Sequence, residues 1–301
     1  MLQLAIELEA LAGLTFYDHV AQCNVAMAVN DMVTLGPLPF CYSQYLAAGS
    51  SDWFKNEKRW RDLVKGTKQA CILARCVWGG GETPTLRDII MPGAVDLAGA
   101  TVGFVQSEER LIRPDRIMSD DAIVIIESSG IHANGLTLAR EIAKKLPDGF
   151  LTRLSDGRTY GETLLDPTRI YVPIVEDCQN SGVHIHYAVN VTGHGWRKIM
   201  RARQSFTYVI DVLPRQLPIF DFIQEHGPVD DREAYGNLNM GAGFVLFVPQ
   251  SDLSNVWDVL ESYDAPDRFG AVIAGHVENG PKKVVIKPKR IEFLGSELGV
   301  R

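Results

Sequence analysis

The chain has 301 residues, of which 46% are hydrophobic and 22% charged, and a formal net charge of −7 at pH 7. This length predicts a sizeable core and two domains, since domains usually hold about 100–200 residues. The acidic balance argues against a nucleic-acid-binding protein, which needs a basic face. No apolar run approaches the roughly 18–20 residues that cross a membrane. The five cysteines lack zinc-type spacing, so we expect reduced thiols in a cytosolic protein.

Hydrophobic periodicity predicts helices and strands that alternate along the chain. Helices are expected at residues 1–12, 22–30, 60–74, 135–145, 217–226 and 253–262, and strands at 95–105, 122–127, 185–191, 208–212 and 243–248. A further strand is expected after residue 71 and should end at Gly79-Gly80-Gly81. The alternation favours an α/β or α+β architecture. The charged stretch 106–121, which contains Pro114, predicts a boundary between domains 1–110 and 111–301.

Two polar strings stand out in the first of these domains. Asn30 and Asp31 end an apolar segment, and Gly80-Gly81-Glu82-Thr83 follows an apolar strand. Carboxylate and amide oxygens suit a hard cation such as Mg²⁺, and glycines let the backbone approach a ligand closely. Each string alone also fits a structural role, with Asp31 capping a helix and Glu82 solvated in a tight turn.

The expected second domain carries three more polar strings. The string Ser128-Ser129-Gly130-Ile131-His132-Ala133-Asn134-Gly135 joins a strand to a helix, where backbone N–H groups can bind an anion. It also fits an ordinary turn capped by Ser129 or Asn134. Arg169 can fork onto a phosphate or hold its own loop by an ion pair. After Val191-Thr192-Gly193-His194-Gly195, the basic residues Arg197, Lys198 and Arg201 could attract a phosphate or face solvent.

Together with Leu238-Asn239-Met240-Gly241-Ala242-Gly243, and in this order, these strings resemble those of the aminoimidazole ribonucleotide synthetase family. The family is also called phosphoribosylformylglycinamidine cyclo-ligase, and the resemblance covers nearly the whole chain. It implies a two-domain α+β fold whose N-terminal domain contributes to a β-barrel at a homodimer interface. It also implies a cytoplasmic ligase of purine biosynthesis that uses ATP to close formylglycinamidine ribonucleotide to aminoimidazole ribonucleotide.

The resemblance assigns a role to the residues of each string. It implies that Mg²⁺ is held by Asp31 and Glu82, and that the ATP site comprises Asn30, Asp31, Gly80, Gly81, Glu82 and Thr83. The ribonucleotide substrate is expected to contact Ser129, Gly130, His132, Asn134, Arg169, Thr192 and Gly193, with a structural role as the alternative for His132. The expected catalytic residues are Asp31, Glu82 and His194.

The chain also departs from the family pattern. The lysine-containing glycine-rich stretch and the Asp-Gly-x-Gly-Thr-Lys string that precede Asp31 in the family are not found, so we expect the chain to begin inside the pattern. Cys23 stands where aspartate is usual, Asn190 where histidine is usual, and His194 where glycine is usual. Two alternatives stay open: a diverged or truncated non-catalytic homologue, and a superfamily member with another substrate, such as thiamine monophosphate kinase.

Overall fold

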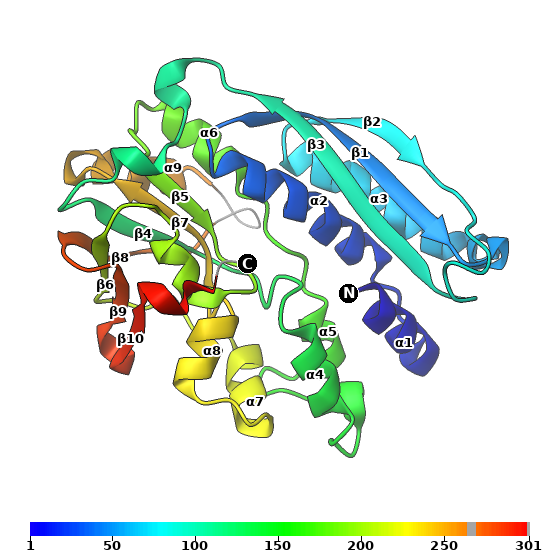
Figure 1. Ribbon diagram of the computed structural model, residues 1–301. Helices are drawn as coiled ribbons and strands as arrows, with labels where there is room; N and C mark the ends of the chain where they lie inside the picture. The colour runs from blue at the N-terminus through cyan, green and yellow to red at the C-terminus, as the bar shows by residue number, and fades with distance from the viewer. Residues whose placement is uncertain (264–268, 300–301) are drawn as a thin grey trace.

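The computed structural model describes residues 1–263 and 269–299, and these residues form two sheets with helices packed on them. A three-stranded sheet has the order β2-β1-β3, and a seven-stranded sheet has the order β10-β9-β6-β8-β4-β7-β5. The strands of the first sheet all precede those of the second in the sequence (Figure 1). Largely antiparallel sheets in separate parts of the chain confirm the predicted α+β class.

The first sheet comprises β1 (Leu38–Ala48), β2 (Val77–Glu82) and β3 (Val95–Phe104). β1 lies in the middle, parallel to β2 and antiparallel to β3. Three helices belong to this part: α1 (Leu2–Ala12), α2 (Tyr17–Val33) and α3 (Glu57–Leu73). α2 packs against α3, β1 and β3, and also reaches α6 and β5 of the second part. It therefore lies between the three-stranded sheet and the rest of the molecule (Figure 1).

The second sheet comprises seven strands: β4 (Ala122–Glu127), β5 (Tyr187–Asn190), β6 (Phe206–Ile210), β7 (Ala242–Val248), β8 (Ala271–Asn279), β9 (Lys283–Ile286) and β10 (Ile291–Leu294). β4 pairs antiparallel with both β7 and β8. Its side chains alternate between two separate cores, with Ile123 and Ile125 in one and Val124 and Ile126 in the other. Burial on both faces explains why this strand is apolar throughout.

Six helices cover the second sheet and its margins within the described residues: α4 (Leu136–Ala143), α5 (Tyr160–Leu164), α6 (Val172–Asn180), α7 (Pro218–His226), α8 (Asp231–Asn237) and α9 (Leu253–Glu261). α6 and α9 pack together, and α7 contacts α4 and α5. A 3₁₀ helix, Gly195–Met200, follows β5 and packs against α8. No helix in the described part of the chain is both long and apolar enough to cross a membrane.

The predicted strand ending at Gly79-Gly80-Gly81 is wrong at its end, because β2 continues through the glycines to Glu82. β2 is an edge strand, where glycine interrupts few contacts. Gly81 is needed there, since a Cβ atom would lie 1.7 Å from the carbonyl oxygen of Gln44 on β1. The helices predicted at 22–30 and 60–74 are present as α2 and α3. β1, α5, α6, α8 and β8 to β10 were not predicted. The domain division near residue 110 stays a prediction.

Candidate functional site

Asp31 lies in the last turn of α2, beside a pocket of about 370 Å³ that joins the two halves of the chain. We call it the Asp31 pocket. Its lining combines polar groups from α2, from the loop after β4, from the loop before α6 and from the end of β5, namely Asn24, Asn30, Asp31, His132, Asn134, Thr168, Asn190 and Thr192. Five residues predicted from three separate strings therefore meet here: Asn30, Asp31, His132, Asn134 and Thr192.

Asp31 is oriented by a residue from the second half of the chain. Asn190 Nδ2 donates a hydrogen bond of 2.8 Å to Asp31 Oδ1. Asn190 stands where the family pattern has histidine, and it supplies a donor at that position. Because Asp31 is exposed, its carboxylate is accessible from the pocket.

The Asp31 carboxylate fits Mg²⁺ as a single protein ligand. Among the described residues, no group of three or more His, Cys, Asp or Glu side chains is placed to hold a metal ion. Mg²⁺ commonly keeps several waters and binds one or two carboxylates together with substrate phosphates. The pocket therefore offers one carboxylate to such an ion, and the Mg²⁺ site at Asp31 stays a prediction.

Asn30 is completely buried and connects α2 to the loop before α6. Its Nδ2 donates to the carbonyl oxygen of Arg169 at 2.7 Å, and its Oδ1 accepts from the backbone N–H of Tyr171 at 2.9 Å. Both polar groups of the side chain are thus engaged with backbone. Asn30 fixes the position of Asp31 and of Thr168, which also lines the pocket.

His132 has a defined tautomer because of its contact with Ser129. The backbone N–H of Ser129 can only donate, and it donates to His132 Nε2 at 3.0 Å, so the ring proton lies on Nδ1. Burial, with a smaller contribution from the charge on Arg169, lowers the pKa of His132 to about 3. In the described structure its Nδ1 has no hydrogen-bond partner. The site therefore holds a neutral imidazole with an unused donor.

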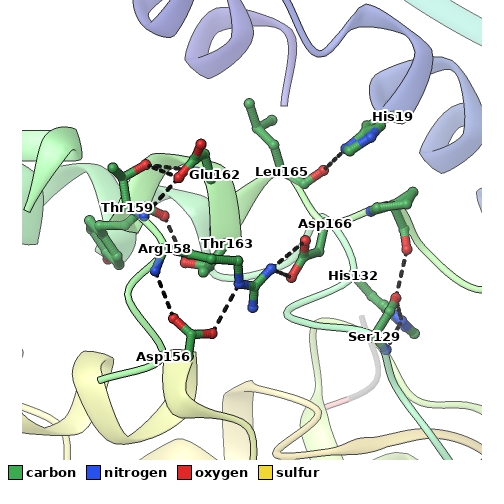
Figure 2. Close-up of polar contacts among 12 residues, drawn as sticks. His19, Ser129, His132, Asp156, Arg158, Thr159, Glu162, Thr163, Leu165 and Asp166 are labelled. Carbon is green, nitrogen blue, oxygen red and sulfur yellow. Dashed lines mark hydrogen bonds and ion pairs between the residues drawn. The ribbon is translucent and has the colours of Figure 1, made fainter. Parts of the chain in front are cut away.

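Ser129 faces away from the Asp31 pocket. Its hydroxyl donates to the carbonyl oxygen of Pro167 at 2.6 Å (Figure 2). Ser129 and Arg169 line a neighbouring pocket of about 380 Å³ together with Arg75, Tyr263 and Phe269. The guanidinium of Arg169 lies over the Phe269 ring, 5.4 Å from its centroid. These two predicted substrate residues are therefore placed next to the Asp31 pocket and not in it.

A partly exposed ion-pair cluster holds the segment that leads to Thr168. Arg158 Nη1 lies 2.9 Å from both carboxylate oxygens of Asp166, and Arg158 also pairs with Asp156 (Figure 2). Burial raises the pKa of Asp166, whereas the Arg158 charge opposes that effect. The backbone of Asp166 precedes Pro167, so this cluster positions one wall of both pockets.

Asn239 organises the loop after β4, although no site role was predicted for it from the sequence. It is 1% exposed, its Nδ2 donates to the Gly130 carbonyl oxygen, and its Oδ1 accepts from Ser128 and from the backbone of Gly241. Its own carbonyl accepts from Trp196 Nε1 at 2.8 Å. A polar residue directly before a buried strand was the available signal, since buried amides must find partners.

Thr192 and Lys198 extend the site behind the pocket. Lys198 lies in the 3₁₀ helix Gly195–Met200 and is 7% exposed, and its Nζ donates to Thr192 Oγ1 at 2.6 Å. Burial lowers the pKa of Lys198, and the Asp31 carboxylate acts in the opposite direction. Lys198 therefore faces the protein interior, which excludes the solvent-facing alternative from the sequence.

Gly193 and His194 lie at the rim of the site. A Cβ atom at Gly193 would lie 3.3 Å from Asn134 Oδ1, so glycine keeps this approach open. His194 is exposed, and the described lining of the Asp31 pocket does not include it. Partial burial and the charges of Arg197, Arg201 and Lys198 lower its pKa. Its catalytic role stays a prediction.

Cys23 occupies the place of the usual aspartate and supports Thr168. The thiol sulfur accepts hydrogen bonds from Thr168 N–H at 3.2 Å and from Thr168 Oγ1 at 3.3 Å. The side chain is 3% exposed, and burial raises the pKa of the thiol. A neutral sulfur thus replaces a carboxylate beneath the pocket wall.

The glycine string of the first domain lies apart from the Asp31 pocket. Gly80, Gly81 and Glu82 are exposed on β2, Thr83 follows them, and Glu82 is in register with Tyr45 of β1. Among the described residues that line the Asp31 pocket, none comes from β2. Within one chain the two predicted metal ligands, Asp31 and Glu82, do not share this pocket.

Comparisons with known proteins match the chain from near its start to near its end. The family model for the N-terminal domain of AIR synthase related proteins matches residues 4–105, and the model for the C-terminal domain matches residues 119–287. A Methanocaldococcus jannaschii protein named phosphoribosylformylglycinamidine cyclo-ligase is 37% identical over 90% of this chain and 77% of its own length. A Carboxydothermus hydrogenoformans protein of the same name is 34% identical over 93% of this chain and 80% of its own.

Solved structures share the fold at low sequence identity. The hydrogenase maturation protein HypE is 16% identical with a TM-score of 0.64, over 91% of this chain and 81% of HypE. The thiamine monophosphate kinase of Aquifex aeolicus is 16% identical with a TM-score of 0.58, over 92% of this chain and 83% of the kinase. At this identity the solved structures show a shared fold only. Family membership is shown by the two family models and by the relatives that are 34–37% identical. The chain belongs to the AIR synthase related protein family.

Proposed function

We propose that the protein is an ATP-dependent phosphoribosylformylglycinamidine cyclo-ligase of purine biosynthesis. The observation that carries the proposal is the Asp31 pocket, where residues of three family strings converge on one accessible carboxylate. The relatives that bear this name at 37% and 34% identity support the same activity. The structural neighbours with other names are only 16% identical, so they give no reason to prefer another substrate.

The reaction turns a poor leaving group into a good one. The formyl oxygen of formylglycinamidine ribonucleotide takes the terminal phosphoryl group of ATP, and ADP leaves. The amidine nitrogen then attacks the formyl carbon, the carbon–oxygen bond breaks, and the oxygen departs as inorganic phosphate. With the loss of one proton the imidazole ring of aminoimidazole ribonucleotide is closed. One ATP is consumed for each ring, and positioning and charge neutralisation supply most of the catalysis of such transfers.

The residues of the pocket have distinct roles in this scheme. Asp31, oriented by Asn190, holds Mg²⁺, which neutralises phosphate charge when bound. The neutral His132 contacts the substrate from the pocket that it lines, and Asn134 and Thr192 contact the ribonucleotide from the same pocket. Ser129 and Arg169 serve the neighbouring pocket, where the Arg169 guanidinium suits a phosphate.

We also propose that the protein acts as a homodimer formed through the open face of the three-stranded sheet. Phe40, Val102 and Phe104 are more than half exposed there, and the two phenylalanine rings lie 6.4 Å apart between centroids. An apolar patch of this kind commonly marks an interface. In that assembly Gly80, Gly81, Glu82 and Thr83 contribute to an ATP site. The free thiols of the chain favour the reducing cytoplasm.

The decisive test is formation of aminoimidazole ribonucleotide from formylglycinamidine ribonucleotide, ATP and Mg²⁺. The unaltered chain should form product and release ADP in equal amounts, and Asp31→Ala should lose at least about 10²-fold in rate, as when a preorganised charged group is removed. Asp148→Ala, which removes an exposed carboxylate elsewhere, is the matched control and should keep the activity. A folded wild-type chain that forms no product would contradict the proposal and favour a non-catalytic homologue.

A further inference from the structure

Lys198 is a buried cation that forms no direct ion pair with any residue the structure describes. Its side chain is 7% exposed, and within the described residues its ammonium contacts the Thr192 hydroxyl but no carboxylate. Burying an unpaired charge is costly, and an apolar residue of similar length would pack at lower cost. The described residues give this lysine no carboxylate partner, so its charge is available to an anionic ligand.

The position of that partner follows from the surroundings of Lys198. Thr192 lines the Asp31 pocket together with Asn190 and Asp31. Lys198 itself lies behind Thr192, on the 3₁₀ helix Gly195–Met200, whose start follows the pocket loop. The ammonium is therefore one hydrogen bond behind a ligand that contacts the Thr192 hydroxyl in the pocket.

The direction of this hydrogen bond determines what Thr192 can do. An ammonium only donates, so at 2.6 Å the Thr192 oxygen accepts, and its own hydrogen is left to point elsewhere. A bond to a charged donor is stronger than a neutral one and polarises the hydroxyl. The Thr192 hydroxyl is thereby left to donate, and because Thr192 lines the pocket, an anionic oxygen there suits it as acceptor.

We propose that Lys198, acting through Thr192, supplies the positive charge that binds the terminal phosphate of ATP beside Asp31. The inference rests on the proposed function, which brings ATP and Mg²⁺ to Asp31. Thr192, which the proposed function places against the ribonucleotide, also contacts the phosphate that is transferred to it, and Lys198 is a positioning residue. In this arrangement ATP is bound from both halves of the chain. The N-terminal half holds its Mg²⁺ through Asp31, and the C-terminal half supplies the Lys198 cation.

Nucleotide binding measured by titration calorimetry tests this assignment without turnover. The probes are ADP and a non-hydrolysable ATP analogue that keeps the terminal phosphate, each with Mg²⁺. The unaltered protein should bind the analogue more tightly than ADP. Lys198→Met should weaken the analogue about 10- to 100-fold and leave ADP nearly unchanged, as expected for loss of one charge-assisted hydrogen bond. Lys145→Met, which removes an exposed lysine, is the matched control and should preserve both affinities.

A double-mutant cycle tests the path through Thr192. Thr192→Val should match the loss in Lys198→Met, and the double variant should lose no more than either single variant. Thr192→Ser keeps the hydroxyl and should retain the preference for the analogue. Thermal unfolding checks each variant. If Lys198→Met does not fold, the Val and Ser substitutions at Thr192 still carry the comparison.

The outcomes separate this inference from the function on which it rests. A wild-type chain that binds neither nucleotide would overturn the proposed function and the inference together. A wild-type chain that binds both, with an unchanged preference in Lys198→Met, would overturn the inference alone. Additive losses in the double variant would overturn the path through Thr192. If Lys198→Met keeps the preference for the ATP analogue but loses ribonucleotide binding, the inference is overturned, and Lys198 serves the ribonucleotide instead.

Discussion

The Asp31 pocket and the glycine string of β2 resemble the same family equally well, yet one chain completes only the first of them. Asp31 receives a hydrogen bond from Asn190, far away in the sequence, and Thr168, His132 and Thr192 close the pocket around it. Glu82 lies exposed on an edge strand next to an uncovered apolar face. A motif can thus be recognised in the sequence whether or not its own chain supplies the residues that surround it.

The largest effect should come from removing the support of the pocket. Asn239→Ala should lower the free energy of unfolding by about 2–4 kcal/mol, because three buried hydrogen bonds are lost and their partners are left unsatisfied. Urea unfolding measures the change. Asn255→Ala on the exposed side of α9 is the control and should not destabilise the protein. Equal stability of the two variants would show that the loop after β4 does not depend on Asn239.

Glu82 tests the incomplete half of the comparison. Glu82→Gln should reduce turnover about 10²-fold if the carboxylate holds the metal–nucleotide complex. The free energy of unfolding should change by less than about 0.5 kcal/mol, since the side chain is exposed. Steady-state rates and urea unfolding measure the two effects. Glu108→Gln provides an exposed control outside β2. Unchanged turnover in Glu82→Gln would remove β2 from the site.

The buried His132 of the Asp31 pocket should make the free energy of unfolding depend on pH. Its folded pKa of about 3 lies below the ordinary value of 6.5, so below pH 6.5 the unfolded chain takes up a proton that the folded chain does not. This contribution is complete above pH 6.5 and is lost as the pH falls towards 3, by up to about 1.4 kcal/mol per unit. Between pH 7 and pH 5, the free energy of unfolding should fall less steeply in His132→Gln than in the unaltered protein. Identical slopes would contradict the buried neutral imidazole.

The smallest effect on the folded chain should come from the uncovered face of the first sheet. Val102 is 68% exposed on β3, so Val102→Glu should leave the secondary structure and the stability of the subunit nearly unchanged. The substitution should nevertheless convert a dimer to a monomer by placing a charge in an apolar interface. Light scattering after gel filtration measures the mass. Met118→Glu, at a position 61% exposed outside the sheets, should remain dimeric. A monomeric wild-type protein would rule out the proposed interface.

The sequence predicted the elements whose signal is local. Ala26, Met27 and Ala28 favour a helix at α2, and the unbroken apolar run of β4 predicts a strand buried on both faces. β1 was missed because Pro39 and the polar Ser43 and Gln44 obscure its pattern. These residues are accommodated by a bulged register with both neighbouring strands.

For the site, the sequence predicted which strings matter but not how they meet. Asp31 and His132 share a pocket because α2 is packed against the second half of the chain, which no local pattern reports. The burial of Lys198 and the supporting role of Asn239 also depend on tertiary contacts. Chemistry-bearing residues can therefore be named from sequence, whereas their supporting partners emerge only with the fold.

Because of the contacts of Asn30, substitutions should be tolerated less well at position 30 than at its partners, positions 169 and 171. The Asn30 side chain bonds to backbone atoms of Arg169 and Tyr171, so these hydrogen bonds do not depend on which side chains stand at positions 169 and 171. At position 30 itself, aspartate would lose the donor and glutamine would be one methylene too long. A search for distant relatives should therefore require the asparagine as strictly as the neighbouring aspartate. A sequence that keeps Asp31 but changes Asn30 has the ligand without the contact that fixes its pocket wall.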